Sequence, residues 1–467
     1  MKENIYIYYT NDLHSNFTQW PRTAGYLKEK KRIRSSKGEV HYIVDAGDHM
    51  DRVDPISEAT MGKANVELMN EVGYDVVTIG NNEGITLAHD DLYHLYDEAD
   101  YPVVCANLQP KSGQPPKWLV DTNIFETDSG VRLGFIGLTA PFTAFYDPLG
   151  WTVTSPYDEL ETNLLELSEK TDIIILLSHL GLSEDQEIAR RFSEIDVIIG
   201  GHTHHLLRTG EYVNNCLITA AGKHCVYVGE VILTYDHESE QISTKEAYAT
   251  NVSDHPVDQG TAVLLEELQE KADLLLEKEV VVLEEPLDVE WYKDTPIMQE
   301  LTDTIRMWTD ADAALLNAGL LLGALPKGPI TYGDVHRICP HPINPVVVQL
   351  KGDELIEVIR ASLKRDFMEF ELKGFGFRGE VIGRMLFSGL SINIRTNPDG
   401  TEAVTEVTFS DGTPVDKQKT YRIATADTFT FGRLLPEIAK SEKKDYFLPE
   451  FLRDLLLETL KRKALQR

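Results

Sequence analysis

The sequence predicts an α/β protein of two domains, the first of which is a two-sheet α/β sandwich with helices outside. Two observations predict this class. The first half of the chain alternates short apolar runs, rich in Ile, Val and Tyr and typical of buried parallel strands, with amphipathic helical stretches. The chain also has 467 residues, which is more than a single hydrophobic core usually holds.

Five of the predicted strands end in residues that can bind a metal ion. The strands are the runs IYIYYT, HYIVDA, VVTI, IIILL and VIIG. The segments at their ends are Asp12-Leu13-His14, Gly47-Asp48, Gly80-Asn81-Asn82-Glu83, Ser178-His179 and Gly201-His202-Thr203-His204. Because the carboxyl ends of parallel strands meet at one edge of a sheet, we expect these side chains to converge. Seven Asp, Asn and His side chains suit two adjacent ions bridged by a carboxylate, an arrangement that clamps the oxygens of a phosphoester.

Each segment alone is a weak indication. A lone Asp-x-His is more often a turn, Gly-Asp after a strand is a common turn, and Gly-His-Thr-His can cap a helix. The five segments nevertheless occur in order, each at the end of a strand. Together they therefore predict a dinuclear metal site.

The remainder of the first half completes the sandwich and leads into a long helix. After SEIDVIIGGHTHH, the runs YVNNCLITAAG and VYVGEVILTYDH read as antiparallel strands. The polar stretch NVSDHPVDQG marks a boundary. The next run, TAVLLEELQEKADLLLEKEV, has apolar residues at helical spacing and predicts a helix.

The ordered segments resemble those of the calcineurin-like metallophosphoesterase superfamily, and the chain length narrows the resemblance to the bacterial 5'-nucleotidase family. The resemblance covers nearly the whole chain. It implies a metallophosphoesterase domain over residues 1–250 and a linker helix within residues 251–285. Residues 286–467 resemble the smaller α+β domain that recognises the substrate in that family.

The resemblance also implies a role for each predicted metal ligand. Asp48 matches the bridging carboxylate. The ligands of the first metal match Asp12, His14 and His204, and those of the second match Asn81, His179 and His202. Oxygen and imidazole donors without a thiolate fit two divalent ions such as Mn²⁺, Zn²⁺, Mg²⁺ or Fe²⁺.

The third segment departs from the family pattern, which is Gly-Asn-His-Glu followed two residues later by Asp. Asn82 stands at the His position and Ile85 at the Asp position, so the pair that assists the phosphoryl transition state in the family is replaced. We predict Asn82 as the catalytic residue, because its amide can still donate a neutral hydrogen bond to a phosphate oxygen. One such donor is typically worth about 10²–10³ in turnover, so we expect a slower enzyme or one with another acid. The candidates for that acid are His49, His89, His94 and His205.

The second half keeps the order of the family's C-terminal segments but alters its substrate-reading residues. Asn317 remains from Asn-x-Gly-x-x-Arg, whereas Leu322 replaces the Arg. The family's Pro-Phe, whose ring stacks on the base, becomes Pro340-His341. The predicted substrate-binding residues are therefore Asn317, His341 and Phe429, with Phe431 as an alternative to Phe429. The other interpretation is that these rings belong to the core.

A Gly-rich stretch offers a replacement for the missing Arg. In GFGFRGEVIGRM, Arg378 and Arg384 can approach a phosphate or a carboxylate. Glycines let backbone amides come close to an anion. The same stretch is also compatible with a loop that binds nothing.

Charge and composition limit the classes of partner. The chain has 45 basic and 76 acidic residues, which gives a net charge of -31. Such a surface repels polyanions, so we expect a small phosphorylated substrate rather than a nucleic acid polymer or an anionic membrane. The sequence does not indicate an oligomeric state.

The N-terminus and the cysteines predict a cytoplasmic protein. Residues 1–4 lead straight into the first strand without the pattern of a signal peptide, and no apolar stretch reaches the length of a membrane span. The four cysteines lack C-x-x-C spacing and are expected to be buried and reduced.

Two functions of different class follow from these patterns. The first is a metal-dependent phosphohydrolase that acts by metal-activated water on a phosphoester of a nucleotide or a similar small molecule. The second is a catalytically weakened regulatory protein that binds metals and a ligand. Retention of all seven ligand positions favours the enzyme, whereas the changed residues at 82, 85 and 322 favour the regulatory protein.

Overall fold

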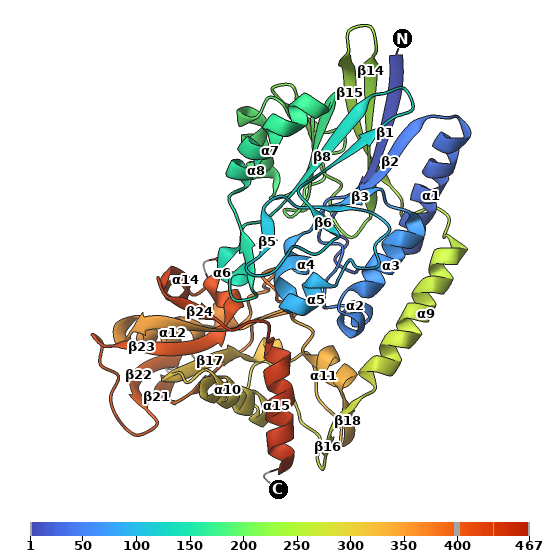
Figure 1. Cartoon of the computed structure of the whole chain (residues 1–467). Coiled ribbons are helices and arrows are strands. Elements are labelled where there is room, and N and C mark those ends of the chain that lie inside the picture. Colours follow the sequence, from blue (N-terminus) through green and yellow to red (C-terminus); the bar gives the residue numbers. More distant parts are fainter. Residues whose placement is uncertain (1, 397–401, 433, 466–467) are drawn as a thin grey trace. The chain divides into compact units, whose positions relative to one another are not determined.

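The computed structural model describes residues 2–396, 402–432 and 434–465, and the chain forms two compact units, Met1–Ala272 and Asp273–Arg467 (Figure 1). The division between the units falls inside helix α9 (Gln259–Leu276). The predicted linker range, 251–285, contains this helix and also strand β16 (Glu279–Leu283), which pairs with β18 (Gly328–Thr331) of the second unit. The domain limits 1–250 and 286–467 remain predictions.

The first unit contains a seven-stranded and a six-stranded sheet, in the orders β15-β14-β1-β2-β3-β4-β6 and β12-β13-β11-β10-β8-β7. In the first sheet β1, β2, β3, β4 and β6 are parallel neighbours, and β14 and β15 extend it antiparallel. Its strands are β1 (Lys2–Thr10), β2 (Val40–Asp45), β3 (Val76–Val77), β4 (Val103–Val104), β6 (Leu119–Val120), β14 (Tyr227–Asp236) and β15 (Gln241–Asn251). Those of the second are β7 (Thr122–Glu126), β8 (Arg132–Thr139), β10 (Ile173–His179), β11 (Val197–Gly200), β12 (Glu211–Val213) and β13 (Cys216–Thr219).

Helices surround these sheets, and two further strands, β5 (Leu108–Pro110) and β9 (Trp151–Val153), pair with each other. The helices of this unit are α1 (Trp20–Ser36), α2 (Pro55–Thr60), α3 (Lys63–Val72), α4 (Asn81–Thr86), α5 (His89–Tyr93), α6 (Thr143–Tyr146), α7 (Pro156–Lys170) and α8 (Leu182–Arg191).

Strand β10 shows why the two sheets form a sandwich. Because successive side chains of a strand point to opposite faces, Ile175 and Leu177 enter the cluster that contains Ile7 and Val44 of the other sheet. Ile174, which precedes Ile175, enters a second cluster with Leu160 of α7 and other helical residues. Both faces of β10 are therefore buried, as its unbroken apolar run predicts. The predicted two-sheet α/β sandwich is confirmed.

The second unit is smaller and of the α+β type. Its five-stranded sheet has the order β20-β17-β23-β19-β24, in which only β17 and β23 pair in parallel. Two further antiparallel pairs are β21 with β22 and β16 with β18. The strands are β17 (Ala313–Asn317), β19 (Pro345–Lys351), β20 (Met385–Ser388), β21 (Leu390–Thr396), β22 (Glu402–Phe409), β23 (Thr420–Ala426) and β24 (Lys444–Tyr446).

Helices of the second unit contribute to one hydrophobic core with this sheet. They are α10 (Pro296–Trp308), η1 (Ala318–Leu320), α11 (Tyr332–Ile338), α12 (Gly352–Ser362), α13 (Arg365–Met368), η2 (Asp427–Thr430), α14 (Pro436–Lys440) and α15 (Leu452–Leu465). Among the helices of the described ranges, none combines the length and the apolar character that a membrane span requires.

A buried acid in η2 makes the stability of the second unit depend on pH. Burial raises the pKa of Asp427 to about 8, although backbone N–H groups of Asn344 and Thr428 oppose the shift. An unfolded Asp has a pKa of about 3.9, so between these values the native state binds more protons than the unfolded state. The free energy of unfolding therefore falls as pH rises, by up to about 1.4 kcal/mol per pH unit from this residue.

Asp427→Asn should remove this contribution. The difference in the free energy of unfolding between wild type and variant, measured by urea unfolding of the full chain from pH 5 to pH 8, should change in favour of the variant as pH rises. The exposed Asp310→Asn is the control. A difference that stays constant over this range would contradict the prediction.

Candidate metal centre

The predicted metal ligands lie at the carboxyl ends of parallel strands from both sheets. Asp12 and His14 follow β1, Asp48 follows β2, and Asn81 begins α4 just after β3. On the other sheet His179 is the last residue of β10, and His202 and His204 follow β11. The sandwich thus presents both sets of loops at one edge, where α/β proteins build their sites.

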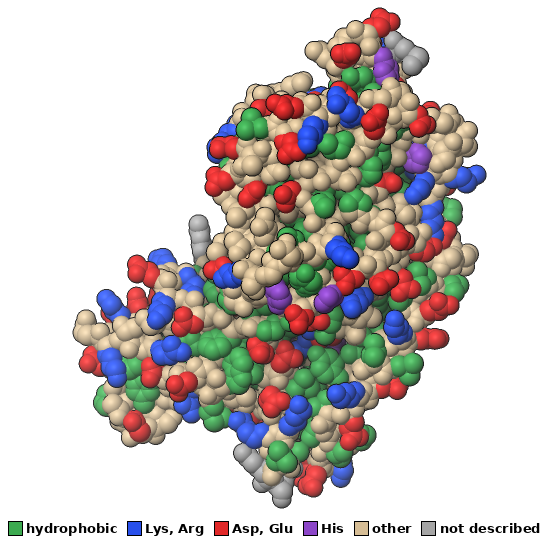
Figure 2. Space-filling model, viewed as in Figure 1, with side chains coloured by type: hydrophobic (Ala, Val, Ile, Leu, Met, Phe, Trp, Pro, Cys, Tyr) green, Lys and Arg blue, Asp and Glu red, His purple; other side chains and the backbone are tan. Residues whose placement is uncertain are grey.

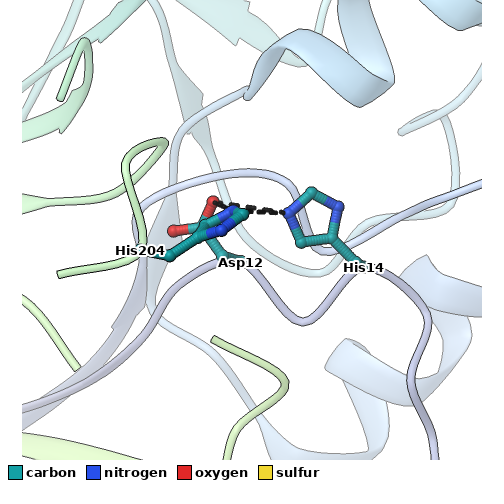
Figure 3. Close-up of side chains that lie close together, drawn as sticks. All are labelled: Asp12, His14 and His204. Carbon is teal, nitrogen blue, oxygen red and sulfur yellow. Dashed lines mark hydrogen bonds and ion pairs between the residues drawn. The ribbon is translucent and has the colours of Figure 1, made fainter. Parts of the chain in front are cut away.

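Asp12, His14 and His204 form one group whose ligand atoms all lie within 4.8 Å of one another (Figure 3). Asp12 Oδ1 is 3.6 Å from His14 Nε2 and 3.3 Å from His204 Nε2, and the two Nε2 atoms are 3.0 Å apart. Two imidazole nitrogens and one carboxylate oxygen therefore face the same point. This is a set of donors that a divalent ion accepts.

Asp48, His179 and His202 form the second group, again within 4.8 Å. Asp48 Oδ2 is 3.2 Å from His179 Nε2 and also 3.7 Å from His14 Nε2 of the first group. The Asp48 carboxylate consequently lies between the two groups, which is the position that a bridging ligand requires.

Two buried atoms at this edge are suited to a bound cation. Asn81 Oδ1 is buried and has no hydrogen-bond partner among the described residues, and His179 Nε2 is buried 3.2 Å from the Asp48 carboxylate. His179 Nδ1 donates to the carbonyl of Ala46 at 2.7 Å, so Nε2 is the nitrogen that would bind a metal once the ion displaces its proton. A buried polar atom without a partner costs about 1–3 kcal/mol. The presence of such an atom at Asn81 therefore indicates that a ligand binds there. The carboxylate, amide and imidazole donors thus fit divalent ions.

Backbone strain is concentrated at the same residues. Five of the predicted ligands have a left-handed φ, a conformation that costs non-glycine residues of the order of 1–3 kcal/mol and clusters at functional sites. They are Asp12 (52°), His14 (51°), Asp48 (54°), His202 (69°) and His204 (57°). Strain repeated in loops that follow three different strands indicates that the position of these side chains, rather than local stability, determines the backbone.

Hydrogen bonds join the ligand-bearing loops to one another. The backbone N–H of Asp12 donates to the carbonyl of Gly47 at 3.0 Å, and that of His14 donates to the carbonyl of Asp48 at 2.9 Å. The N–H of His202 donates to Asp12 Oδ2 at 3.0 Å. At Gly80 a Cβ atom would lie 2.0 Å from Asp48 Oδ1, so only glycine lets the carboxylate approach this loop.

Glu83 holds the Asp48 loop in place. Its carboxylate accepts the backbone N–H groups of Asp48 (3.1 Å), Met50 (2.9 Å) and Gly80 (2.9 Å). Burial, followed by the charge of Asp48, raises the pKa of Glu83 to about 7. Glu83 has no role in the predicted site, although a Glu in the third position of a helix is a known capping signal.

Burial and neighbouring charges shift the pKa values of the candidate ligands. Burial by itself lowers the pKa of His14 and of His179, but the neighbouring carboxylates raise each to about 10. Burial favours the neutral acid at Asp12, yet hydrogen bonds from His14 and His204 hold its pKa below the usual range. His202 differs, because burial and the charge of His179 lower its pKa to about 4 and leave it as the neutral imidazole that metals bind.

Two further residues near the first group were missed by sequence reasoning. Asp51 Oδ2 lies 3.5 Å from His14 Nδ1, where it can accept the hydrogen of a metal-ligating imidazole. In the sequence Asp51 lies three residues after Asp48, and this proximity could have pointed to a place in the site. His224 packs edge-on against His14 with ring centroids 6.2 Å apart, and no motif near it pointed to the site.

The predicted catalytic Asn82 lies in the centre, with its Nδ2 2.8 Å from Asp48 Oδ2. Each of the four histidines named as alternative acids contacts another side chain. Their partners are the Trp20 ring for His49, the Trp151 ring for His89, Asp97 for His94 and Thr203 for His205.

The structure places the three predicted substrate-binding residues in the interior of the second unit. Asn317 Nδ2 donates to the carbonyl of Ile382 at 2.8 Å. His341 donates from Nε2 to the carbonyl of Leu320, accepts the N–H of Arg378 at Nδ1 and stacks on Phe377 with centroids 5.2 Å apart. Phe429 is 1% exposed and stacks on Phe367. Their contact with substrate remains a prediction, and their packing agrees with the core interpretation.

The loop between α13 and β20 carries two further side chains that could meet a ligand, Arg384 and Phe375. Arg384 pairs with Asp294 at 2.7 Å, so its guanidinium already has an acidic partner. Phe375 is 51% exposed and lies parallel to the Phe431 ring, with centroids 5.9 Å apart and planes within 8°. Phe431 was predicted as an alternative substrate-binding ring, whereas Phe375 was not predicted.

The three N–H groups on Glu83 lead to a testable prediction. Glu83→Gln replaces one acceptor oxygen by an NH₂ group that faces a backbone donor. We expect a loss of about 1–3 kcal/mol in the free energy of unfolding and a displaced Asp48 loop. After loading with Mn²⁺ and dialysis, elemental analysis should find less bound metal than in wild type. The exposed Glu98→Gln should match wild type, and a Glu83→Gln protein with full metal content would contradict this role.

Comparison with known proteins places this geometry in a family. Residues 5–206 match the calcineurin-like phosphoesterase family, and residues 279–433 match the 5'-nucleotidase C-terminal domain. The chain is 42% identical to the uncharacterized metallophosphoesterase YunD of Bacillus subtilis, over 98% of this chain and 99% of that protein.

Solved structures share the fold over almost the whole length. A 5'-nucleotidase precursor from Thermus thermophilus superimposes with a TM-score of 0.60 at 21% identity, covering 99% of this chain and 97% of its own. The NAD nucleotidase NadN of Haemophilus influenzae gives a TM-score of 0.67 at 16% identity, with 99% and 97% covered. The chain therefore belongs to the calcineurin-like metallophosphoesterases that carry a 5'-nucleotidase C-terminal domain, a family of hydrolases.

Proposed function

We propose that this chain uses two divalent ions to hydrolyse a phosphoester of a nucleotide or a similar small molecule. The observation that carries the proposal is the pair of adjacent ligand groups, with Asp48 Oδ2 3.2 Å from His179 Nε2 of one group and 3.7 Å from His14 Nε2 of the other. When bound, two divalent ions would activate water and neutralise the charge that develops on phosphorus.

The side chains of the centre divide this work. Asp12, His14 and His204 would hold one ion, and Asp48, which faces both groups, would be shared. His179 and His202 hold the other ion together with Asn81, whose Oδ1 has no other partner in the described chain. The left-handed loops keep these groups in place before substrate arrives, so little reorganisation is needed at the moment of reaction.

A nucleotide is the favoured substrate because the second unit has a pair of parallel rings, of which Phe375 is exposed and Phe431 half-buried. Phe375 and Phe431 have centroids 5.9 Å apart, close to the ~7 Å that two stacking contacts of about 3.5 Å each require. The hydroxyl of Thr428 in η2 donates to the carbonyl of Phe375 and joins the two ring-bearing segments. We infer that these rings, rather than the interior His341 and Phe429, provide the aromatic surface for a base.

Surface charge supports a small substrate. Acidic side chains are spread over both units on the face shown in Figure 2, in keeping with the net charge of -31. A nucleic acid polymer would be repelled, whereas a small phosphoester can be drawn to the ions of the centre. A cytoplasmic location, with all four cysteines free, belongs to the same proposal.

The regulatory alternative has one specific observation in its favour. Asn317 and His341, which stand at positions that read the substrate in the family, are committed to contacts inside the second unit. A protein that binds metals and a ligand without turnover would show this pattern. The activity measurement below distinguishes the two functions.

The first test is hydrolysis of p-nitrophenyl phosphate and bis-p-nitrophenyl phosphate by protein loaded with Mn²⁺. We expect metal-dependent turnover, reduced at least about 10²-fold in His202→Ala, because a ligand of the second ion is lost. His237→Ala removes a histidine between β14 and β15 that pairs with Glu3 at 3.0 Å; it is the control and should keep wild-type activity. No turnover by wild type with both ions bound would favour the regulatory function.

The ring pair is tested separately from the metals. Phe375→Ala should lower kcat/KM for AMP about tenfold, since stacking on a base is worth about 1–3 kcal/mol. It should leave kcat/KM for ribose 5-phosphate, which has no base, unchanged. Phe370→Ala removes another exposed Phe (45% exposed) and is the control. Equal losses on both substrates would show that Phe375 does not stack on a base.

A further inference from the structure

Asn82 occupies a position in the metal centre that suggests a role other than contact with substrate. Its backbone N–H donates to Asp48 Oδ1 at 2.7 Å, and its side-chain Nδ2 donates to Asp48 Oδ2 at 2.8 Å. One residue thus holds both oxygens of the carboxylate that lies between the two ligand groups. Asn82 is itself buried, with 8% of its surface exposed.

The oxygen held by the side chain is the one that both groups share. Asp48 Oδ2 faces His179 Nε2 at 3.2 Å and His14 Nε2 at 3.7 Å. Rotation about the last bond of an Asp side chain is soft, because this torsion has broad minima. Two hydrogen bonds from Asn82, one to each oxygen, remove that freedom and direct Oδ2 to the point between the groups.

The surroundings of Asn82 define the orientation of its amide. Because the Asp48 carboxylate only accepts, the nitrogen of the amide must face Oδ2. The same Nδ2 lies 3.0 Å from His14 Nδ1. In the tautomer that frees His14 Nε2 for a metal, Nδ1 carries the hydrogen and Asp51 Oδ2 is its acceptor. The hydrogen bond that Asn82 keeps in the loaded centre is therefore the one to Asp48.

We propose that Asn82 is a positioning residue of the metal centre, which orients the shared carboxylate of Asp48 and thereby couples binding of the two ions. The inference rests on the proposed two-ion function. Residues that orient a metal ligand typically contribute about 10–100-fold to metal affinity. The Asn82 backbone donor survives substitution, so the loss of the side chain should weaken the centre without abolishing it.

The test uses Asn82→Leu, which keeps the approximate size of the side chain and removes its donor, in the full chain. Mn²⁺ binding is followed by elemental analysis after equilibrium dialysis and by electron paramagnetic resonance, in which two ions that share a ligand give an exchange-coupled spectrum. Wild type should bind two coupled ions. Asn82→Leu should bind Mn²⁺ about 10–100-fold more weakly and lose part of the coupled signal. Asn163→Leu, which removes an amide that donates to the α7 backbone, is the matched control.

The outcomes separate the inference from the function on which it rests. Wild type that binds fewer than two ions would overturn the proposed function. Wild type that binds two coupled ions, with Asn82→Leu indistinguishable in affinity and spectrum, would overturn the inference alone. A variant that loses turnover but keeps both metal readouts would show that Asn82 contacts the substrate instead. If thermal unfolding shows that Asn82→Leu does not fold, Asn82→Ala replaces it with the same expected losses.

Discussion

The joint between the loop after β2 and the N-terminus of α4 is the constraint on which the candidate centre depends. Glu83 accepts three backbone N–H groups, two of them from the loop that bears Asp48. In return Asn82 donates to both oxygens of Asp48. Gly80 makes this approach possible because a side chain there would overlap the carboxylate. The shared ligand of the centre is therefore fixed by a helix end and not by its own strand.

The rest of the first unit supports that joint. Both sheets bury their parallel strands on two faces, so the strands cannot shift without opening the cores between and beside them. This rigidity sustains a left-handed backbone at Asp12, His14, Asp48, His202 and His204. A less well packed scaffold would let the backbone relax. In this unit the packing holds the candidate ligands in a strained backbone conformation that is suited to binding cations.

The second unit departs from the family pattern at the positions that resemble its substrate-reading residues. Positions that resemble substrate-reading residues are turned to packing, as His341 shows by its two backbone hydrogen bonds and its contact with Phe377. The parallel rings are instead those of the exposed Phe375 and the half-buried Phe431. The metal edge has all seven candidate ligands, but Asn82 and Ile85 replace the His and Asp of the family pattern there, so the chain departs from that pattern in both units.

The sequence by itself determined the two-sheet sandwich and the strand-end positions of the seven candidate ligands, because unbroken apolar strands and polar residues at their ends are local patterns. It indicated the second α+β unit only through the resemblance to a family. Tertiary structure alone decided which atoms meet. Asp51 and His224 join the centre through contacts between loops far apart in the chain, and Asn82 faces a carboxylate 34 residues away. Likewise, no local pattern shows that His341 is buried and Phe375 exposed, since both follow from how the second unit packs.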